Sequence, residues 1–151
     1  MKIVIQRVIE SSVSIKDAEP ICISEGLIIF VGFCKDDTDD DILWGIKKII
    51  NMKILRGKDG NYDLNTLEKK SEILVISQFT LLASIKKGNK PSWHRAADQR
   101  LARNLYDRFL NFLKQMYLAK NVKKGFFGKH MEINIINDGP ITIILDSKNK
   151  I

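Results

Sequence analysis

The chain has 151 residues, of which 44% are hydrophobic and 28% charged, and its formal net charge is +7. This length suits one domain with a sizeable core and is too short for two. The longest apolar stretch, 27–34, is too short to span a bilayer, and Gln6 and Arg7 interrupt the first apolar run too early for a signal peptide. These numbers argue against a membrane protein, and the basic charge favours an anionic partner such as nucleic acid.

The first half of the chain reads as apolar strands followed by one helix. The predicted strands are 2–8, 12–15 and 27–34. The acidic stretch 35–41 follows, and clustered carboxylates can bind hard cations. However, Thr38 and Asp41 have the spacing of a capping box, which favours a helix start over a metal loop. That helix is expected over 39–52, with its isoleucines on one face.

The two cysteines, Cys22 and Cys34, lie in apolar contexts without C-x-x-C spacing or a nearby histidine. We expect free, buried thiols rather than a disulfide, as in a protein of the reducing cytosol. The predicted localisation is therefore cytoplasmic.

The second half adds a second helix and more strands. The expected elements are a turn at 57–61, a strand at 73–82, a basic loop at 86–91, a helix at 95–117 capped by Ser92, and strands at 131–136 and 141–145. Strands outnumber helices, so the predicted fold is a mixed α/β domain. In this fold a largely antiparallel, barrel-like sheet is covered on its outside by two amphipathic helices.

Two short segments, 77–81 and 137–142, sit where a predicted strand meets a turn, which is where main-chain groups become available to a ligand. Ser77 and Thr80 could act as nucleophiles, but a hydroxyl needs a base within reach. The only histidines, His94 and His130, have no triad-like spacing, so surface or capping roles are favoured. Alternatively, the turn after Ser77 donates main-chain N–H groups to a developing oxyanion.

From spacing alone, Gly139-Pro140 and the neighbouring Asp138 read as an ordinary turn. The basic clusters at 86–90 and 123–129 adjoin the two segments in sequence. Solvated loops and contacts with nucleic-acid phosphates both remain open for these lysines.

Several motifs spread along the chain make a more specific pattern. They are Gln6-Arg7-Val8, Gly26-Leu27 leading to Gly32, Lys35-Asp36-Asp37, Ser77-Gln78-Phe79-Thr80-Leu81, Gly88-x-Lys90-Pro91-Ser92, Gly128-x-x-Met131 and Asn137-x-Gly139-Pro140-x-Thr142. With these motifs the chain resembles the D-aminoacyl-tRNA deacylase family of bacterial and eukaryotic type, nearly end to end. Trp93-His94 departs from the family pattern, which leaves only tRNA contacts in doubt.

The resemblance implies one domain over 1–151, a homodimer, and hydrolysis of the ester that joins a D-amino acid to the 3′-terminal adenosine of tRNA. It implies no cofactor, no metal, and neither DNA nor membrane as a partner. The residues that it assigns to catalysis are Ser77, Gln78, Phe79 and Thr80. The residues that it assigns to substrate binding are Arg7, Met131, Gly139 and Pro140.

In the family picture Gly139-Pro140 is cis, is supported by Arg7 and enters the partner subunit's pocket. There its main chain clashes with an L side chain. Glycine would escape this exclusion, so glycyl-tRNA is an expected second substrate. The amides of Phe79 and Thr80 would polarise the ester, and the ribose 2′-OH would assist water. Thr80 as a nucleophile is the competing mechanism.

Two other functions stay open from the sequence. One is a non-catalytic RNA-binding module on the same fold, which the net charge of +7 favours. The other is a hydrolase of small D-amino esters that needs no RNA.

Overall fold

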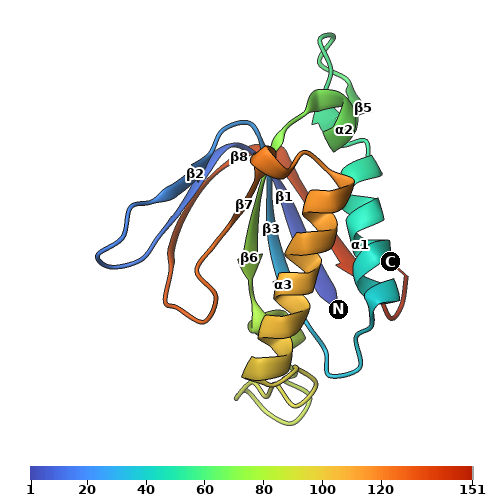
Figure 1. Cartoon of the computed structure of the whole chain (residues 1–151). Coiled ribbons are helices and arrows are strands. Elements are labelled where there is room, and N and C mark those ends of the chain that lie inside the picture. The colour runs from blue at the N-terminus through green and yellow to red at the C-terminus, as the bar shows by residue number, and fades with distance from the viewer. Residues whose placement is uncertain (151) are drawn as a thin grey trace.

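The computed structural model describes residues 1–150, in which a six-stranded sheet carries two long helices on one face (Figure 1). The strands are β1 (Lys2–Ser14), β2 (Ile21–Ile23), β3 (Gly26–Gly32), β4 (Leu55–Arg56), β5 (Tyr62–Leu64), β6 (Glu72–Ser77), β7 (Val122–Lys124) and β8 (Glu132–Asp146). The helices are α1 (Asp39–Asn51), α2 (Thr66–Lys69) and α3 (Gln99–Met116), with 3-10 turns η1 (Phe79–Leu82) and η2 (Ala119–Asn121). The mixed α/β class is confirmed. The short α2 and the β4–β5 hairpin were not predicted.

The sheet is mixed, so the prediction of a largely antiparallel sheet is wrong. Its order is β2-β1-β3-β6-β7, with β8 on the other edge of β1. β1 runs antiparallel to its three neighbours, whereas β3–β6 and β6–β7 are parallel. The parallel pairs arise because the chain crosses from β3 to β6 through α1 and from β6 to β7 through α3. Such helical crossovers return the chain to the same end of the sheet.

β1 and β8 are each continuous where two separate strands were predicted. They pair from Lys2 opposite Asp146 to Ser14 opposite Glu132, with an interruption around Arg7. The register shifts twice, between Gln6 and Val8 and between Val8 and Glu10. Bulges of this kind bend a strand without ending it. They let the sheet curl into a nearly closed, barrel-like shape.

The hydrophobic core divides between the two faces of the sheet. On one face, odd-numbered residues of β1, β3 and β6 pack against α1 and α3. On the other face, a smaller cluster contains Val8, Ile28, Leu74 and Ile76, with side chains of the 126–135 segment packed against it. β3 and β6 are apolar along most of their lengths because both of their faces are covered.

The helix starts follow side-chain caps. The predicted capping box is confirmed, since the Asp41 carboxylate accepts hydrogen bonds from the N–H and the hydroxyl of Thr38. The predicted cap of the second long helix is wrong. The Asp98 carboxylate caps α3 by accepting from the Leu101 N–H at 2.9 Å, whereas Ser92 pairs with Ser84 across a loop.

The predicted turn at 57–61 is confirmed and joins β4 to β5. Both cysteines are free, as predicted; Cys34 is buried, but Cys22 is exposed. No helix within residues 1–150 is long and apolar enough to cross a membrane.

Candidate active site

A cleft of about 670 Å³ lies beside the end of β6. Its walls come from the end of β3, the segment 77–79, the first turn of α3 and the loop 127–131. Three of the predicted catalytic residues, Ser77, Gln78 and Phe79, line it together with Met131. The fourth, Thr80, does not line the cleft.

The chain leaves β6 through a turn rather than by extending the strand to residue 82. The Gln78 N–H still donates to the Val31 carbonyl at 2.8 Å, and η1 then begins at Phe79. Gly32 makes this turn possible, because a Cβ at that position would lie 2.6 Å from the Gln78 carbonyl oxygen. The apolar run Phe79–Leu82 therefore forms a tight turn against β3.

The first two N–H groups of η1 are unbonded. Within residues 1–150, no carbonyl or capping side chain accepts a hydrogen bond from the N–H of Phe79 or Thr80. Unsatisfied donors at a helix start favour a negatively charged or polarised oxygen. The Thr80 hydroxyl accepts a hydrogen bond from the Gln78 side-chain amide, so this side chain is engaged within the turn. The exposed Phe79 ring meets Trp93 edge-on at 5.5 Å.

Two titratable side chains line the cleft on the loop that precedes β8, Lys129 and His130. His130 is exposed, as predicted, but its place in the cleft makes it a candidate base that sequence reasoning missed. Gln99 and Phe127 also line the cleft and were missed, because only tertiary packing brings α3 to this loop. The motif Gly128-x-x-Met131 was the one sequence signal for this wall.

Arg7 belongs to a separate cluster at the β8 edge of β1. Its guanidinium is only 1% exposed. Nε and Nη2 donate to the main-chain carbonyl of Asp138 at 3.1 and 2.9 Å, and Nη1 donates to the Ile54 carbonyl at 2.7 Å. The Asp138 carboxylate also pairs with Nε at 3.0 Å. Arg7 therefore fixes the residue that precedes Gly139.

The β4–β5 hairpin covers this guanidinium. The Tyr62 ring lies 4.4 Å from the Arg7 Cζ, and the Arg56 Nη2 pairs with the Asp138 Oδ1 at 3.2 Å. The hydrogen bond with Arg7 and the positive charge of Arg56 lower the pKa of the exposed Tyr62 hydroxyl. The hairpin and the Gly-Pro segment are thus held by the same two arginines.

Gly139 and Pro140 are exposed on an excursion within β8, and their peptide bond is cis. Gln6 pairs with Thr142 and Val8 with Asn137, so residues 138–141 bulge outward opposite Arg7. Gly139 has φ +128°, and a Cβ there would lie 3.0 Å from the Arg7 Nη2. The predicted turn between two strands is therefore an outward bulge of one strand.

The two groups of predicted site residues lie at different levels of the sheet. Arg7 pairs with Leu27 of β3, whereas Ser77 pairs with Val31. Leu27 and Val31 are four positions apart on β3, which is roughly 13 Å along the strand. One chain therefore brings Ser77, Gln78, Phe79 and Met131 together but does not bring Arg7, Gly139 and Pro140 to them.

Comparison with known proteins gives consistent matches over the whole chain. The family model described as D-Tyr-tRNA(Tyr) deacylase matches residues 4–146. Proteins named D-aminoacyl-tRNA deacylase from Flavobacterium psychrophilum and Bacteroides fragilis are each 45% identical over 150 residues, which is 99% of this chain and of each relative.

Two solved structures share the fold. One, named c-Myc DNA Unwinding Element Binding Protein, superposes with a TM-score of 0.91 at 36% identity, over 97% of this chain and 98% of its own. The other, titled a probable eukaryotic D-amino acid tRNA deacylase, superposes with a TM-score of 0.83 at 16% identity. The match covers 95% of this chain and 97% of that structure's chain. The chain belongs to the D-aminoacyl-tRNA deacylase family, whose members are hydrolases of the aminoacyl-tRNA ester bond.

Proposed function

We propose that this protein hydrolyses the ester of D-aminoacyl-tRNA and releases the free D-amino acid and tRNA. The observation that carries this proposal is the cleft at the end of β6, where Ser77, Gln78 and Phe79 form one wall in a member of this family. The cleft volume of about 670 Å³ suits an aminoacyl-adenosine. The site of action is the cytoplasm, where aminoacyl-tRNA is used.

In the proposed reaction the ester carbonyl rests against the N–H groups of Phe79 and Thr80. These donors have no acceptor within residues 1–150, so they can stabilise the oxyanion without first breaking another hydrogen bond. Water attacks the carbonyl carbon with help from the 2′-OH of the terminal ribose, and the bond to the 3′-oxygen then breaks. His130 is the competing general base because it is a histidine that lines the cleft.

The Thr80 hydroxyl is a weaker candidate for the nucleophile. It accepts a hydrogen bond from the Gln78 side-chain amide within the turn. Attack would require its hydroxyl to leave this contact and turn into the cleft. The Thr80 N–H has no acceptor within residues 1–150 whereas the hydroxyl is engaged by Gln78, so the main-chain group is the more available of the two.

Chiral selection would come from Gly139-Pro140 of a second subunit. This segment is exposed and lies roughly 13 Å along the strands from its own cleft wall. A rigid main chain placed opposite the substrate α-carbon would clash with an L side chain and leave room for hydrogen. D-aminoacyl and glycyl esters would therefore react, whereas L-aminoacyl esters would be excluded.

The open face of the sheet supports a homodimer. On the face away from the helices, Phe30, Val4 and Ile144 lie opposite one another across three strands. Ile144 is 64% exposed although it belongs to an apolar row. Gly139-Pro140 and Ile144 both belong to β8. A dimer that forms through this face would therefore present the Gly-Pro segment of one subunit to the other subunit.

The decisive experiment measures hydrolysis of matched D-tyrosyl-, L-tyrosyl- and glycyl-tRNA by the purified protein. We expect hydrolysis of the D-tyrosyl and glycyl esters and survival of the L-tyrosyl ester. Survival of D-tyrosyl-tRNA, while a control deacylase cleaves it, would contradict the proposal.

A binding function without catalysis is the alternative. The net charge of +7 favours it, and the name of the 36% identical structure refers to a DNA element. This alternative predicts salt-sensitive binding of tRNA or duplex DNA with no ester hydrolysis. Measuring turnover and binding in the same preparation separates the two functions.

A further inference from the structure

Two shallow grooves extend from the candidate cleft along α3. The first, of about 430 Å³, is lined by Gln99, Arg100, Arg103 and Phe127. The second, of about 230 Å³, lies between α3 and the segment 124–129. The cleft shares Gln99 and Phe127 with the first groove, and it shares Phe127 and Lys129 with the second. We call the two together the α3 groove, a continuous surface that leads out of the cleft.

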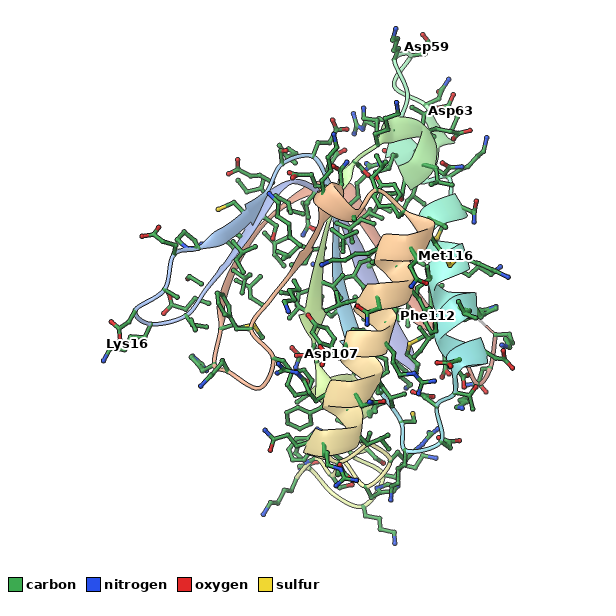
Figure 2. All side chains as sticks on the ribbon, in the orientation of Figure 1. Lys16, Asp59, Asp63, Asp107, Phe112 and Met116 are labelled. Carbon is green, nitrogen blue, oxygen red and sulfur yellow. The ribbon has the colours of Figure 1, made fainter. Side chains whose placement is uncertain are left out.

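The α3 groove is strongly basic. Its exposed cations are Arg100, Arg103, Lys124 and Lys129, and the one carboxylate that lines it is Asp107. Asp107 pairs with Arg103 at 3.3 Å, and no ion pair within residues 1–150 involves the other three cations. Asp107 projects from the side of α3 away from α1 (Figure 2). Most of the positive charge of the groove is therefore available to an anion.

Arg103 is held where the groove meets the cleft. Its Cζ lies 5.1 Å from the centre of the Phe127 ring, which itself packs at 5.5 Å against the ring of buried Tyr106. An arginine stacked on a fixed ring presents its N–H groups outward with little loss of side-chain freedom. This arrangement suits recognition of a phosphate.

Other lysines near the cleft are less suitable. Lys123 is neutralised by Glu72 at 3.0 Å and donates to the Cys22 carbonyl, so it ties β7 to β2 and β6. The lysines of the 86–90 loop line neither the cleft nor the α3 groove. Of the two basic clusters noted in the sequence, only Lys124 and Lys129 reach this surface.

We propose that the α3 groove binds the phosphates of the nucleotides that precede the terminal adenosine of the tRNA acceptor end. This inference rests on the proposed function, which places the terminal aminoacyl-adenosine in the cleft. The preceding phosphates must then leave the cleft over one of its rims, and the α3 rim carries the aligned cations. The contact is with the backbone, so it serves tRNAs of any sequence.

The first test measures the affinity of uncharged tRNA at several salt concentrations. Arg100→Gln combined with Arg103→Gln should weaken binding about tenfold and reduce the salt slope by roughly 0.7 for each lost phosphate contact. The control is Lys58→Gln, on the β4–β5 hairpin beside Asp59 and far from the start of α3 (Figure 2). An affinity and a salt slope that match the wild type in the double variant would overturn the proposal.

A second variant should change the affinity for tRNA in the opposite direction. Asp107→Asn removes the one carboxylate of the groove and releases Arg103, so tRNA should bind two- to threefold more tightly. A folding defect cannot produce tighter binding. Weaker binding by this variant would contradict the proposal.

The hydrolysis assay separates the groove from the proposed function. The double arginine variant should raise KM for D-tyrosyl-tRNA and leave hydrolysis of D-tyrosyl-adenosine, which lacks the preceding phosphates, unchanged. An equal loss on both substrates would overturn the groove proposal. If the wild-type protein cleaves neither substrate, the proposed function fails, while the tRNA affinities of the two variants still decide whether the groove binds nucleic acid.

Discussion

The buried guanidinium of Arg7 donates two hydrogen bonds to the main-chain carbonyl of Asp138, the residue that precedes Gly139. These residues are far apart in sequence and lie on adjacent strands. A planar fork of donors holds this carbonyl in a fixed orientation, which a flexible ammonium group would not do.

Arg7→Lys should therefore lower stability and relax the proposed chiral selection. Loss of hydrogen bonds to a buried charged group costs about 1.5–3 kcal/mol, although the remaining pair between Arg56 and Asp138 limits the loss. Urea denaturation would give the stability, and hydrolysis of L- against D-tyrosyl-tRNA would give the selectivity. Arg56→Gln is the matched control for stability, because its more exposed pair with Asp138 contributes at most about 1 kcal/mol. Unchanged rejection of the L ester in Arg7→Lys would argue against support of Gly139 by Arg7.

Gly32→Ala should reduce kcat because a Cβ would meet the Gln78 carbonyl oxygen at 2.6 Å. The turn that carries the N–H groups of Phe79 and Thr80 must then shift, and a displacement near 1 Å can cost about a hundredfold in rate.

The matched control for Gly32→Ala is Gly26→Ala, whose Cβ would meet the Glu72 carbonyl at the other end of the same strand pair. We expect it to lower stability and leave kcat per folded molecule unchanged. Equal kcat losses in both variants would mean that the effect reaches the site through the whole sheet.

Thr80→Ala should retain most of the deacylase activity, because the proposed reaction uses the main-chain N–H of Thr80. Single-turnover hydrolysis of D-tyrosyl-tRNA measures the chemical step directly. His130→Gln serves as the comparison, since His130 lines the cleft and is the competing general base. Near-complete loss in Thr80→Ala would favour the hydroxyl as nucleophile, and near-complete loss in His130→Gln would favour a histidine base over the ribose 2′-OH.

Ile144→Lys should convert the proposed dimer into monomers and abolish hydrolysis. The side chain is 64% exposed, so the stability of one subunit should change by less than about 0.5 kcal/mol. Light scattering coupled to gel filtration reports the mass. Ile85→Lys is the control, since Ile85 is 68% exposed and lies in the loop after η1. A dimer that survives Ile144→Lys would exclude this face as the interface.

Acid should destabilise the protein through Asp41. Burial raises the pKa of this carboxyl, but hydrogen bonds from Lys148, Thr38 and Ser147 outweigh burial and hold the pKa well below its usual value. The folded state therefore binds this proton less readily than the unfolded state. The resulting stability is present above about pH 4 and declines as pH falls toward the folded pKa.

Lys148→Met should lower the free energy of unfolding at neutral pH by about 2 kcal/mol and make its acid dependence shallower. The Lys148 ammonium lies 2.9 Å from the Asp41 Oδ2. Urea denaturation between pH 3 and pH 7 measures both effects. An unchanged slope between pH 4 and pH 3 in this variant would show that other carboxyls carry the acid dependence.

Local patterns in the sequence predicted much of the fold. The capping box at Thr38 and Asp41 and the turn at 57–61 formed as expected because short-range contacts determine them. The continuity of β8 through Pro140 was not predictable in this way. Proline normally ends a ladder, but here the strand bulges opposite Arg7 and resumes pairing at Thr142.

The site was harder to predict because it depends on contacts between residues that are far apart in the sequence. Ser77, Gln78 and Phe79 are adjacent in sequence, and they do line one cleft. Phe127, Gln99 and His130 reach it only through the packing of α3 against the loop before β8. The parallel pairing of β3 with β6 was also missed, because it depends on how the intervening helix crosses the sheet.

The contacts of the β4–β5 hairpin bear on how the proposed chiral selectivity could be transferred to another protein. Through the Ile54 carbonyl and the Tyr62 ring, a peripheral hairpin takes part in holding Arg7, and Arg7 holds the segment before Gly139. Grafting residues 137–142 alone onto another strand would leave that segment without its support. The smallest set of residues that could be transferred comprises three separate stretches: the one around Arg7, the β4–β5 hairpin and residues 137–142. Recombination between distant relatives should therefore conserve or exchange all three together.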